Sequence, residues 1–343
     1  MKKTKTYFLR FAILFAVLCL CFILNLSLGS VTISFTDTLK VIFGFTIENP
    51  AFEYIIFNYR FPKAITAILV GGGLALSGLL MQTLFRNPLA GPFVLGISSG
   101  ASLGAAILIM GASVLSSFLS LSLINDISLA IASSLGSFLV LFLVIGVSSK
   151  IRDTMALLII GLMFGSITAA IVSVLSYFTD AERLQQYIYW TFGSLGNLSW
   201  QQLGILFIAI VTGIVLSILS IKPLNGYLLG ENYAKSLGID IKRSRLLIIL
   251  AAGVLAGSVT AFTGPIAFIG LAVPHLTKQI FNTTDHKVLV PAVLIYGSII
   301  LLICDIVAQI PGKASVLPIN AITSIIGAPV VIWLLVRKRK MVF

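Results

Sequence analysis

The sequence predicts an all-α polytopic membrane protein with ten transmembrane helices. Of its 343 residues, 58% are hydrophobic and only 10% are charged, and the mean hydropathy is +1.10. Apolar runs of roughly 20 residues recur along the whole chain, and each is long enough to cross the ~30 Å hydrocarbon layer of a bilayer. A soluble core of this size would not need so much apolar surface. We therefore expect one membrane domain over residues 1–343.

Ten spans are expected, with the longer connections at residues 29–61, 178–199, 221–243 and 310–318. The spans cover residues 8–28, 62–83, 94–112, 125–147, 154–177, 200–220, 244–262, 266–281, 288–308 and 318–336. The first span follows a lysine-rich stretch, as a cleaved signal peptide would, but it is long and no small-x-small cleavage site follows it, so a retained helix is favoured. The eighth span is expected to be short and broken, because it begins at Gly264-Pro265 and contains Pro274. Such breaks are tolerated only where neighbouring protein satisfies the backbone groups.

The positive charge is distributed unevenly between the two sides of the membrane. If the N-terminus is cytoplasmic, eighteen of the 23 lysines and arginines lie inside, and the others, Lys40, Arg60, Lys63, Arg183 and Lys313, lie outside. This asymmetry follows the positive-inside rule and predicts an inner-membrane protein with both termini in the cytoplasm. The net charge of +12 is then explained by topology, and a nucleic-acid partner is not expected.

Chemical motifs are scarce. A phosphate-binding loop needs glycines followed by Lys and Ser or Thr, whereas Gly312-Lys313 is followed by Ala314. The cysteines Cys19, Cys21 and Cys304 lie in apolar segments without the spacing of a disulfide or metal site. We therefore expect no metal site, no bound cofactor and no enzymatic activity.

Ionisable residues within the spans are also rare. His275 is open to two interpretations, a proton relay or, with more weight, a hydrogen bond to a broken backbone. Asp305 is the carboxylate set in an apolar run. Ion-driven transporters normally use such carboxylates or broken helices that hold ions, so one candidate argues for another energy source.

The stretch from Arg60 to Gly104 predicts a hairpin of two membrane helices with a break at Arg86-Asn87-Pro88. Its first helix is crowded with glycine, which in lipid permits close approach of helix backbones. Gly96, Gly100 and Gly104 repeat at four-residue spacing and are expected to share one packing face.

The residues of this hairpin resemble those of the FecCD-type permeases of ATP-binding-cassette importers for iron siderophores, haem and cobalamin. The matching residues of the hairpin are Arg60-Phe61-Pro62-Lys63, Gln82, Arg86-Asn87-Pro88-Leu89-Ala90 and Gly96. The resemblance continues through Gly230, Ala234, Leu237, Gly238, Gly264-Pro265-Ile266-Ala267-Phe268-Ile269-Gly270-Leu271, Pro274-His275, Asp305-Ile306-Val307-Ala308, Leu317-Pro318, Thr323 and Gly327-Ala328-Pro329. It covers nearly the whole chain.

The resemblance implies a set of partners. A second permease subunit, identical or related, would form a dimer with the pathway at its interface. Two cytoplasmic ATPase subunits would bind ATP and Mg, and an extracytoplasmic substrate-binding protein would deliver the substrate. The implied substrate is a ferric siderophore or a related iron chelate, with cobalamin or haem as alternatives. An ion-coupled secondary transporter is the rival from another class.

The resemblance also assigns candidate site residues. The cytoplasmic loop at about residues 221–243 would couple to an ATPase through Leu229, Gly230, Ala234, Leu237 and Gly238. Arg60 and Lys63 would dock the binding protein, although snorkelling at a helix start also explains them. The fifth span and the turn before it would line or gate the pathway through Ser148, Ser149, Ser166, Ser173 and Ser176, unless each serine merely bonds its own helix.

Two positions depart from the family pattern. Gln309 stands where an arginine is common, so Lys313 is the candidate for a third docking cation. Asn320 stands where glycine is common, at the expected start of the tenth span.

Overall fold

The computed structural model describes residues 2–47, 49–111, 126–148, 151, 154–309 and 315–336, and all regular structure in these ranges is helical. Each of the ten expected spans coincides with one helix. These helices are α1 (Lys2–Ser27), α4 (Phe61–Leu84), α5 (Ile97–Ile109), α6 (Asp126–Ser148), α7 (Thr154–Phe178), α9 (Trp200–Leu219), α12 (Ile241–Thr263), α13 (Ile269–Phe281), α14 (His286–Ala308) and α15 (Ile319–Val336). Seven of them are long and apolar enough to cross a membrane, while α5, α13 and α15 are shorter.

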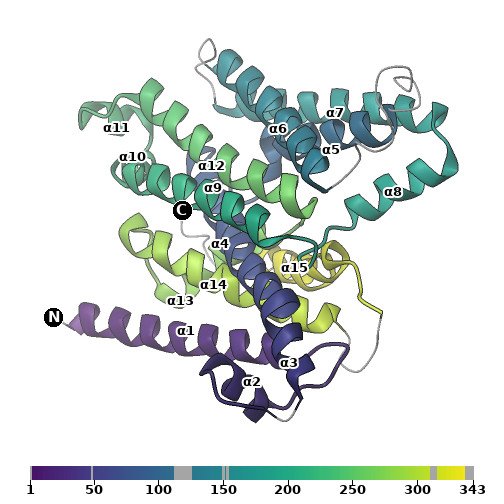
Figure 1. Ribbon diagram of the computed structural model, residues 1–343. Helices are drawn as coiled ribbons and strands as arrows, with labels where there is room; N and C mark the ends of the chain where they lie inside the picture. The colour runs from purple at the N-terminus through teal and green to yellow at the C-terminus, as the bar shows by residue number, and fades with distance from the viewer. Residues whose placement is uncertain are drawn as a thin grey trace.

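Helix α4 lies at the centre of the bundle, where it packs against α14, α12, α13 and α9 (Figure 1). Its glycines make this possible. A Cβ on Gly71 would collide with the carbonyl of Gly297 in α14, and a Cβ on Gly78 would collide with that of Gly270 in α13. The backbones therefore touch directly, as membrane helices with small residues can.

The eighth span is short and follows an irregular stretch, as expected, but α13 itself runs without interruption through Pro274. Helix α12 ends at Gly264, whose φ is +71°, and Phe268 immediately before α13 has a φ of +65°. Asn320 of α15 stabilises this irregular stretch, because its side-chain oxygen accepts a hydrogen bond from the backbone N–H of Ala267 at 3.0 Å. Asn320, a departure from the family pattern, thus pairs a backbone group that the break leaves free.

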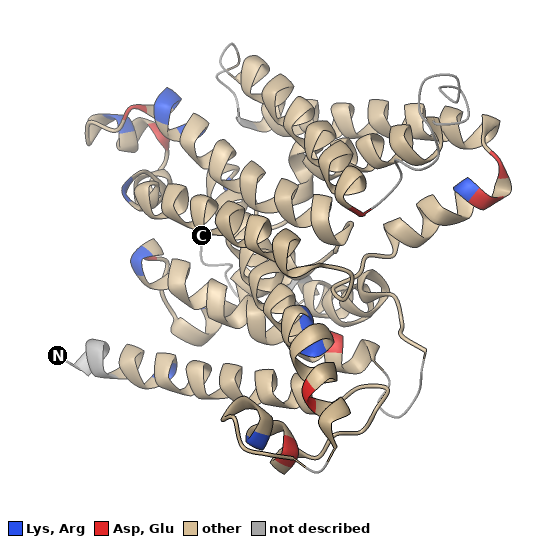
Figure 2. Cartoon of the chain, in the orientation of Figure 1, with Lys and Arg blue, Asp and Glu red and all other residues tan. Residues whose placement is uncertain are grey.

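Short helices cover the two ends of the bundle. At one end lie α2 (Phe35–Ile42), α3 (Pro50–Ile55), the π-helical turn Ile56–Arg60 and α8 (Ala181–Thr191); at the other lie α10 (Ile221–Tyr227) and α11 (Glu231–Ser236) (Figure 1). Charged residues gather mainly at helix ends and in these short elements, and the long helices are almost free of them (Figure 2).

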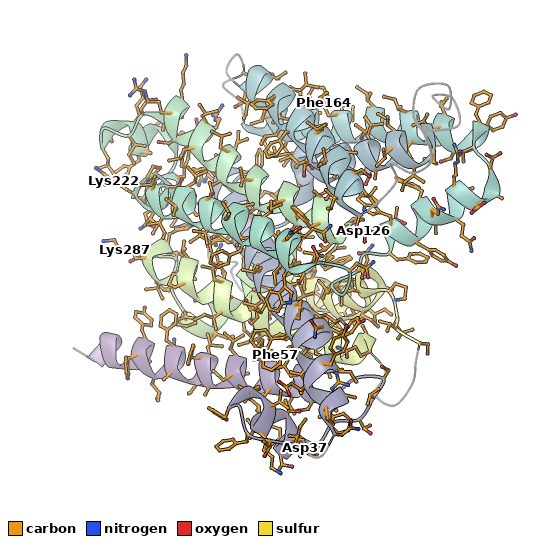
Figure 3. The ribbon with its side chains drawn as sticks, in the orientation of Figure 1. Asp37, Phe57, Asp126, Phe164, Lys222 and Lys287 are labelled. Carbon is orange, nitrogen blue, oxygen red and sulfur yellow. The ribbon has the colours of Figure 1, made fainter. Side chains whose placement is uncertain are left out.

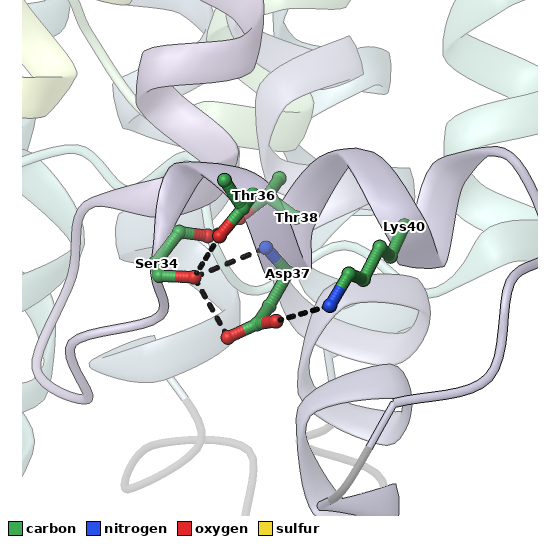
Figure 4. A network of polar contacts seen from close by, with 5 residues as sticks. All are labelled: Ser34, Thr36, Asp37, Thr38 and Lys40. Atoms are coloured by element: carbon green, nitrogen blue, oxygen red, sulfur yellow. Dashed lines mark hydrogen bonds and ion pairs between the residues drawn. The ribbon is translucent and has the colours of Figure 1, made fainter.

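Helix α2 shows how polar residues fix a short helix at its end of the bundle (Figure 4). The Ser34 hydroxyl accepts the backbone N–H of Asp37 at 3.0 Å and donates to the Asp37 carboxylate at 2.7 Å, while Lys40 pairs with the same carboxylate at 3.7 Å. This N-cap and the i, i+3 ion pair hold the helix start.

Candidate functional site

The predicted cytoplasmic loop folds as two short helices joined at Gly230. Gly230 has a φ of +102° and Gly238 has a φ of +77°, so both occupy conformations that side-chain-bearing residues rarely adopt. Burial raises the pKa of Tyr227 in α10 to about 12. Its hydroxyl therefore stays protonated at neutral pH and donates to the carbonyl of Ile241, at 3.1 Å, at the start of α12.

The loop presents apolar side chains outward. Leu229 is 63% exposed and Leu237 is 53% exposed, and Tyr233, which the sequence analysis did not single out, is also exposed. Ala234 is fully buried, and its Cβ packs beside Gly226 of α10. The expectation that Ala234 itself contacts an ATPase is therefore wrong for this conformation, because no part of it reaches the surface.

An open groove of about 710 Å³ lies beside these residues. It is lined by the end of α4 and by the loop, through residues that include Leu84, Arg86, Leu229, Gly230, Tyr233 and Ser236. Exposed leucine and tyrosine beside a groove provide the kind of apolar surface that a partner protein can cover.

Arg245 of α12 attaches the second helix of the loop to the bundle. Its guanidinium Nη2 lies 3.0 Å from Glu231 Oε1 in α11, and its Nη1 donates to the carbonyl of Ile151 at 2.9 Å. The Arg245 side chain is only 6% exposed. One buried cation thus connects α11, α12 and the connection between α6 and α7.

Arg245→Met is expected to destabilise the protein by about 1–3 kcal/mol, because the Ile151 carbonyl loses its donor. The Glu231 carboxylate is 36% exposed, so water can replace the guanidinium there. Lys242→Met, on an exposed neighbour, is the matched control and should stay within about 0.5 kcal/mol. Thermal unfolding of both variants in detergent measures the difference, and equal melting temperatures would contradict the assignment.

At the end of the bundle that carries α2 and α3, which the sequence predicts to be the outer one, Arg60 and Lys63 already have partners. Arg60 is buried, and its guanidinium donates to the carbonyls of Leu26 and Ser27, both at 2.7 Å, and to that of Val31. It therefore caps the end of α1 and is not a free surface cation.

Lys63 belongs to a polar cluster around Asp305. The Lys63 Nζ lies 3.0 Å from Asp305 Oδ1, and these side chains are 16% and 3% exposed. Asp305 Oδ2 accepts hydrogen bonds from Asn25 at 2.8 Å and from Gln309 at 2.7 Å. Asp305 thus joins α1, α4 and α14, and Gln309 donates to a carboxylate rather than projecting toward a partner.

The two cations nevertheless line an outer pocket of about 470 Å³, together with residues 193–197 and Leu317. Their docking role stays a prediction. Lys313 lies outside the described residues.

The pathway serines make bonds within their own helix. In α7 the hydroxyls of Ser166, Ser173 and Ser176 donate to carbonyls one turn earlier, at 3.1, 3.0 and 2.9 Å. Ser148 is the last residue of α6, and Ser149 lies outside the described residues. This pattern matches the structural alternative for the α7 serines, although Ser166 and Ser173 remain exposed on the bundle surface.

Two of the three predicted packing glycines lie against α6. A Cβ on Gly100 would lie 2.5 Å from the carbonyl oxygen of Gly136, and one on Gly104 would collide with the carbonyl of Ala132. Gly96 differs, because it precedes α5 with a φ of +71° and faces Gly161 of α7. The single shared face therefore holds for Gly100 and Gly104 and is wrong for Gly96.

His275 has a structural partner as well. Its Nε2 lies 2.8 Å from the carbonyl of Pro88, in the turn after α4. Because a carbonyl only accepts, the ring donates this bond. The interpretation that His275 satisfies a broken backbone is therefore the one that the geometry supports.

The central helix packs on its neighbours through glycine contacts, a loop at one end of the bundle exposes apolar side chains, and a pocket lies at the other end. These features fit a multi-pass membrane permease. The chain belongs to the FecCD transport family, whose profile matches residues 17–337. This confirms the predicted resemblance to FecCD-type permeases of ATP-binding-cassette importers. The family is one of inner-membrane transport subunits, which are not themselves catalytic.

Similar proteins support this assignment over most of the chain. A vitamin B12 import system permease protein, BtuC, of Klebsiella pneumoniae is 37% identical over 288 residues, covering 84% of each chain. The protein of the same name from Salmonella typhi is 35% identical over 289 residues, covering 84% of this chain and 85% of its own length. A solved structure described as an inward-facing metal-chelate type ABC transporter matches with a TM-score of 0.81 at 28% identity, covering 98% of this chain and all of the other.

Proposed function

We propose that this chain is the membrane-spanning subunit of an ATP-driven importer that moves a bulky metal chelate into the cytoplasm by alternating access. One observation carries the choice against an ion-coupled transporter. Asp305 is the acidic residue set in an apolar run of the described spans. Its carboxylate forms an ion pair with Lys63 and accepts hydrogen bonds from two side-chain amides. A carboxylate with these partners is not available to bind and release a coupling ion.

Energy then comes from separate ATPase subunits. The exposed Leu229, Tyr233 and Leu237 form an apolar surface at the end of the bundle where α10 and α11 lie. A short helix with apolar anchors fits a groove on a partner protein. Two ATPase subunits that bind ATP and Mg are the proposed partners at this surface.

Helix α7 is the proposed contact with the second permease subunit. Within this chain, 17% of the most apolar stretch of α7 is buried. The same share is 83% for the helical span that contains α4. The exposed side chains of α7 include Met155, Ile159, Met163, Ile167 and Val174. In the assembled importer this face would meet membrane lipid, the second subunit and the pathway between them.

The proposed orientation places both termini in the cytoplasm. Lys222 of α10 and Lys287 of α14 point away from the bundle on the side where the N-terminus lies (Figure 3). Cations concentrate on the cytoplasmic side of membrane proteins. The outer pocket beside Lys63 would then face the substrate-binding protein, whose acidic residues could meet cations there.

The substrate class has three candidates. A ferric siderophore follows from the family as a whole, while the relatives named for vitamin B12 import favour cobalamin. Haem is the third candidate, and like the other two it is a bulky metal chelate. All three call for a wide pathway without a tight binding site, since a conduit must release what it carries.

Reconstitution tests this proposal. The chain, its ATPase and its binding protein in proteoliposomes should accumulate radiolabelled cobalamin or a siderophore loaded with radiolabelled iron only when ATP is supplied. The imported probe identifies the substrate class. Uptake by the chain without any ATPase, driven by a proton or sodium gradient, would overturn the proposal.

A further inference from the structure

A buried polar chain connects the first helix of the cytoplasmic loop to the centre of the bundle. His286, the first residue of α14, is fully buried. Its backbone N–H and its ring Nδ1 both reach the Asn225 side-chain oxygen in α10, at 3.0 and 2.7 Å. Its Nε2 lies 2.9 Å from the hydroxyl of Thr83 in α4. His286 of α14 thus contacts two other helices, α10 and α4, that are distant in sequence.

The bonding partners of Asn225 and His286 determine which atoms donate and which accept. The Asn225 amide nitrogen donates to Asp285 at 2.8 Å, and because a carboxylate accepts, the amide oxygen must face His286. The oxygen therefore accepts two bonds from His286, and the ring carries a proton on Nδ1. In a neutral ring, Nε2 is then an acceptor. The Thr83 hydroxyl, which lies 2.9 Å from both this nitrogen and the carbonyl of Leu79, shares its one proton between the two.

Asp285 keeps this arrangement oriented. Partial burial pushes the pKa of Asp285 up, but hydrogen bonds from the Lys287 backbone and the Asn225 amide outweigh it, so the pKa is lowered overall. The carboxylate is therefore ionised at neutral pH and holds the amide in one orientation.

Displacement of α10 relative to α14 would break bonds to a group that water does not reach. A buried polar group that loses its partner is unfavourable, so the two helices are expected to move together. The Arg245 attachment described above reaches α12 and Ile151 instead. The two short helices of the loop are thus anchored to different parts of the bundle.

We propose that His286 is a positioning residue that makes α4 and α14 follow movements of α10. The proposal rests on the proposed function of the loop as the contact for an ATPase. A side chain that served folding alone would change stability without changing the amount of substrate moved for each ATP hydrolysed.

The test uses the full chain assembled with its ATPase and binding protein in proteoliposomes. The variants are His286→Ala, His286→Gln and Asn225→Ala, with Lys287→Ala as the control on an exposed neighbour. The probe is cobalamin or the iron-loaded siderophore, whichever the wild type imports. We expect His286→Ala and Asn225→Ala to lower probe transported per ATP about tenfold, the factor that corresponds to ~1.4 kcal/mol. His286→Gln should restore most of it, because an amide both donates and accepts, and Lys287→Ala should leave it unchanged.

Hydrogen exchange of the α10 amides gives a second readout that does not depend on transport. It should be faster in His286→Ala and in Asn225→Ala than in the wild type, because α10 loses its anchor. Equal exchange in α10, or an unchanged ratio of transport to ATP hydrolysis, would overturn the proposal. If His286→Ala fails to insert, Asn225→Ala decides, since Asn225 is only half-buried and its loss opens no core. A wild type that moves its substrate without an ATPase would refute the proposed function, while the α10 exchange rates would still decide whether the anchor exists.

Discussion

Lys63→Met is expected to cost about 3–5 kcal/mol of stability, because it leaves the Asp305 carboxylate buried without its cation. Asp305 is 3% exposed, so its carboxylate has little contact with solvent that could compensate for the lost ammonium group. Asn25 and Gln309 would still donate to the carboxylate, but neither carries charge. The measurement is thermal unfolding of the purified chain in detergent, together with the amount of folded protein recovered from membranes.

The double variant Lys63→Met with Asp305→Asn is the matched control. Removal of both charges of a buried pair is often nearly neutral, so most of the lost stability should return. If the single and double variants unfold at the same temperature, the ion pair is not what holds the outer ends of these helices together.

Leu229→Asp and Leu237→Asp are expected to weaken association with the ATPase about tenfold or more each, since apolar anchors at interfaces commonly contribute over ~1 kcal/mol. Both side chains are largely exposed, so the fold of the loop should survive. The dissociation constant of the permease and ATPase, measured in detergent or nanodiscs, is the readout.

Val316→Asp serves as the control for these variants, because Val316 is an exposed apolar residue that lines the outer pocket. It should leave ATPase association unchanged. Ala234→Arg is unsuitable as a test, because an arginine at this buried position would disrupt the loop itself. An unaltered dissociation constant in Leu229→Asp and Leu237→Asp would place the contact elsewhere.

The sequence was sufficient to predict the helices that cross the membrane. The thickness of the hydrocarbon layer sets a length that apolar runs must meet, and the irregular stretch before the short eighth span could be recognised from Gly264 and Pro265. Pro274 was a misleading signal, because α13 continues through it. These signals are local. They therefore require no knowledge of which helices become neighbours.

The candidate site was harder to predict, because its residues depend on partners far along the chain. Arg60 and Lys63 are charged residue types that usually lie at the surface. Nothing nearby in sequence reveals that Arg60 bonds to the end of α1 or that Lys63 pairs with Asp305. Ala234 was misplaced for a similar reason. If the loop had formed one continuous amphipathic helix, Ala234 would have been exposed. Instead the chain turns at Gly230, and α11 packs against α10.

Direct backbone contact between α4 and its neighbours sets the mutational tolerance of the chain. At Gly71 and Gly78 a methyl group would overlap a carbonyl of the facing helix, so even alanine requires the helices to separate. Most of α7 is not buried by other parts of this chain. Substitution of one apolar side chain by another on its exposed face therefore causes no such overlap within the chain. Sequence differences among related permeases should therefore concentrate in the helices at the periphery of the bundle, while the distances between α4, α13 and α14 stay the same.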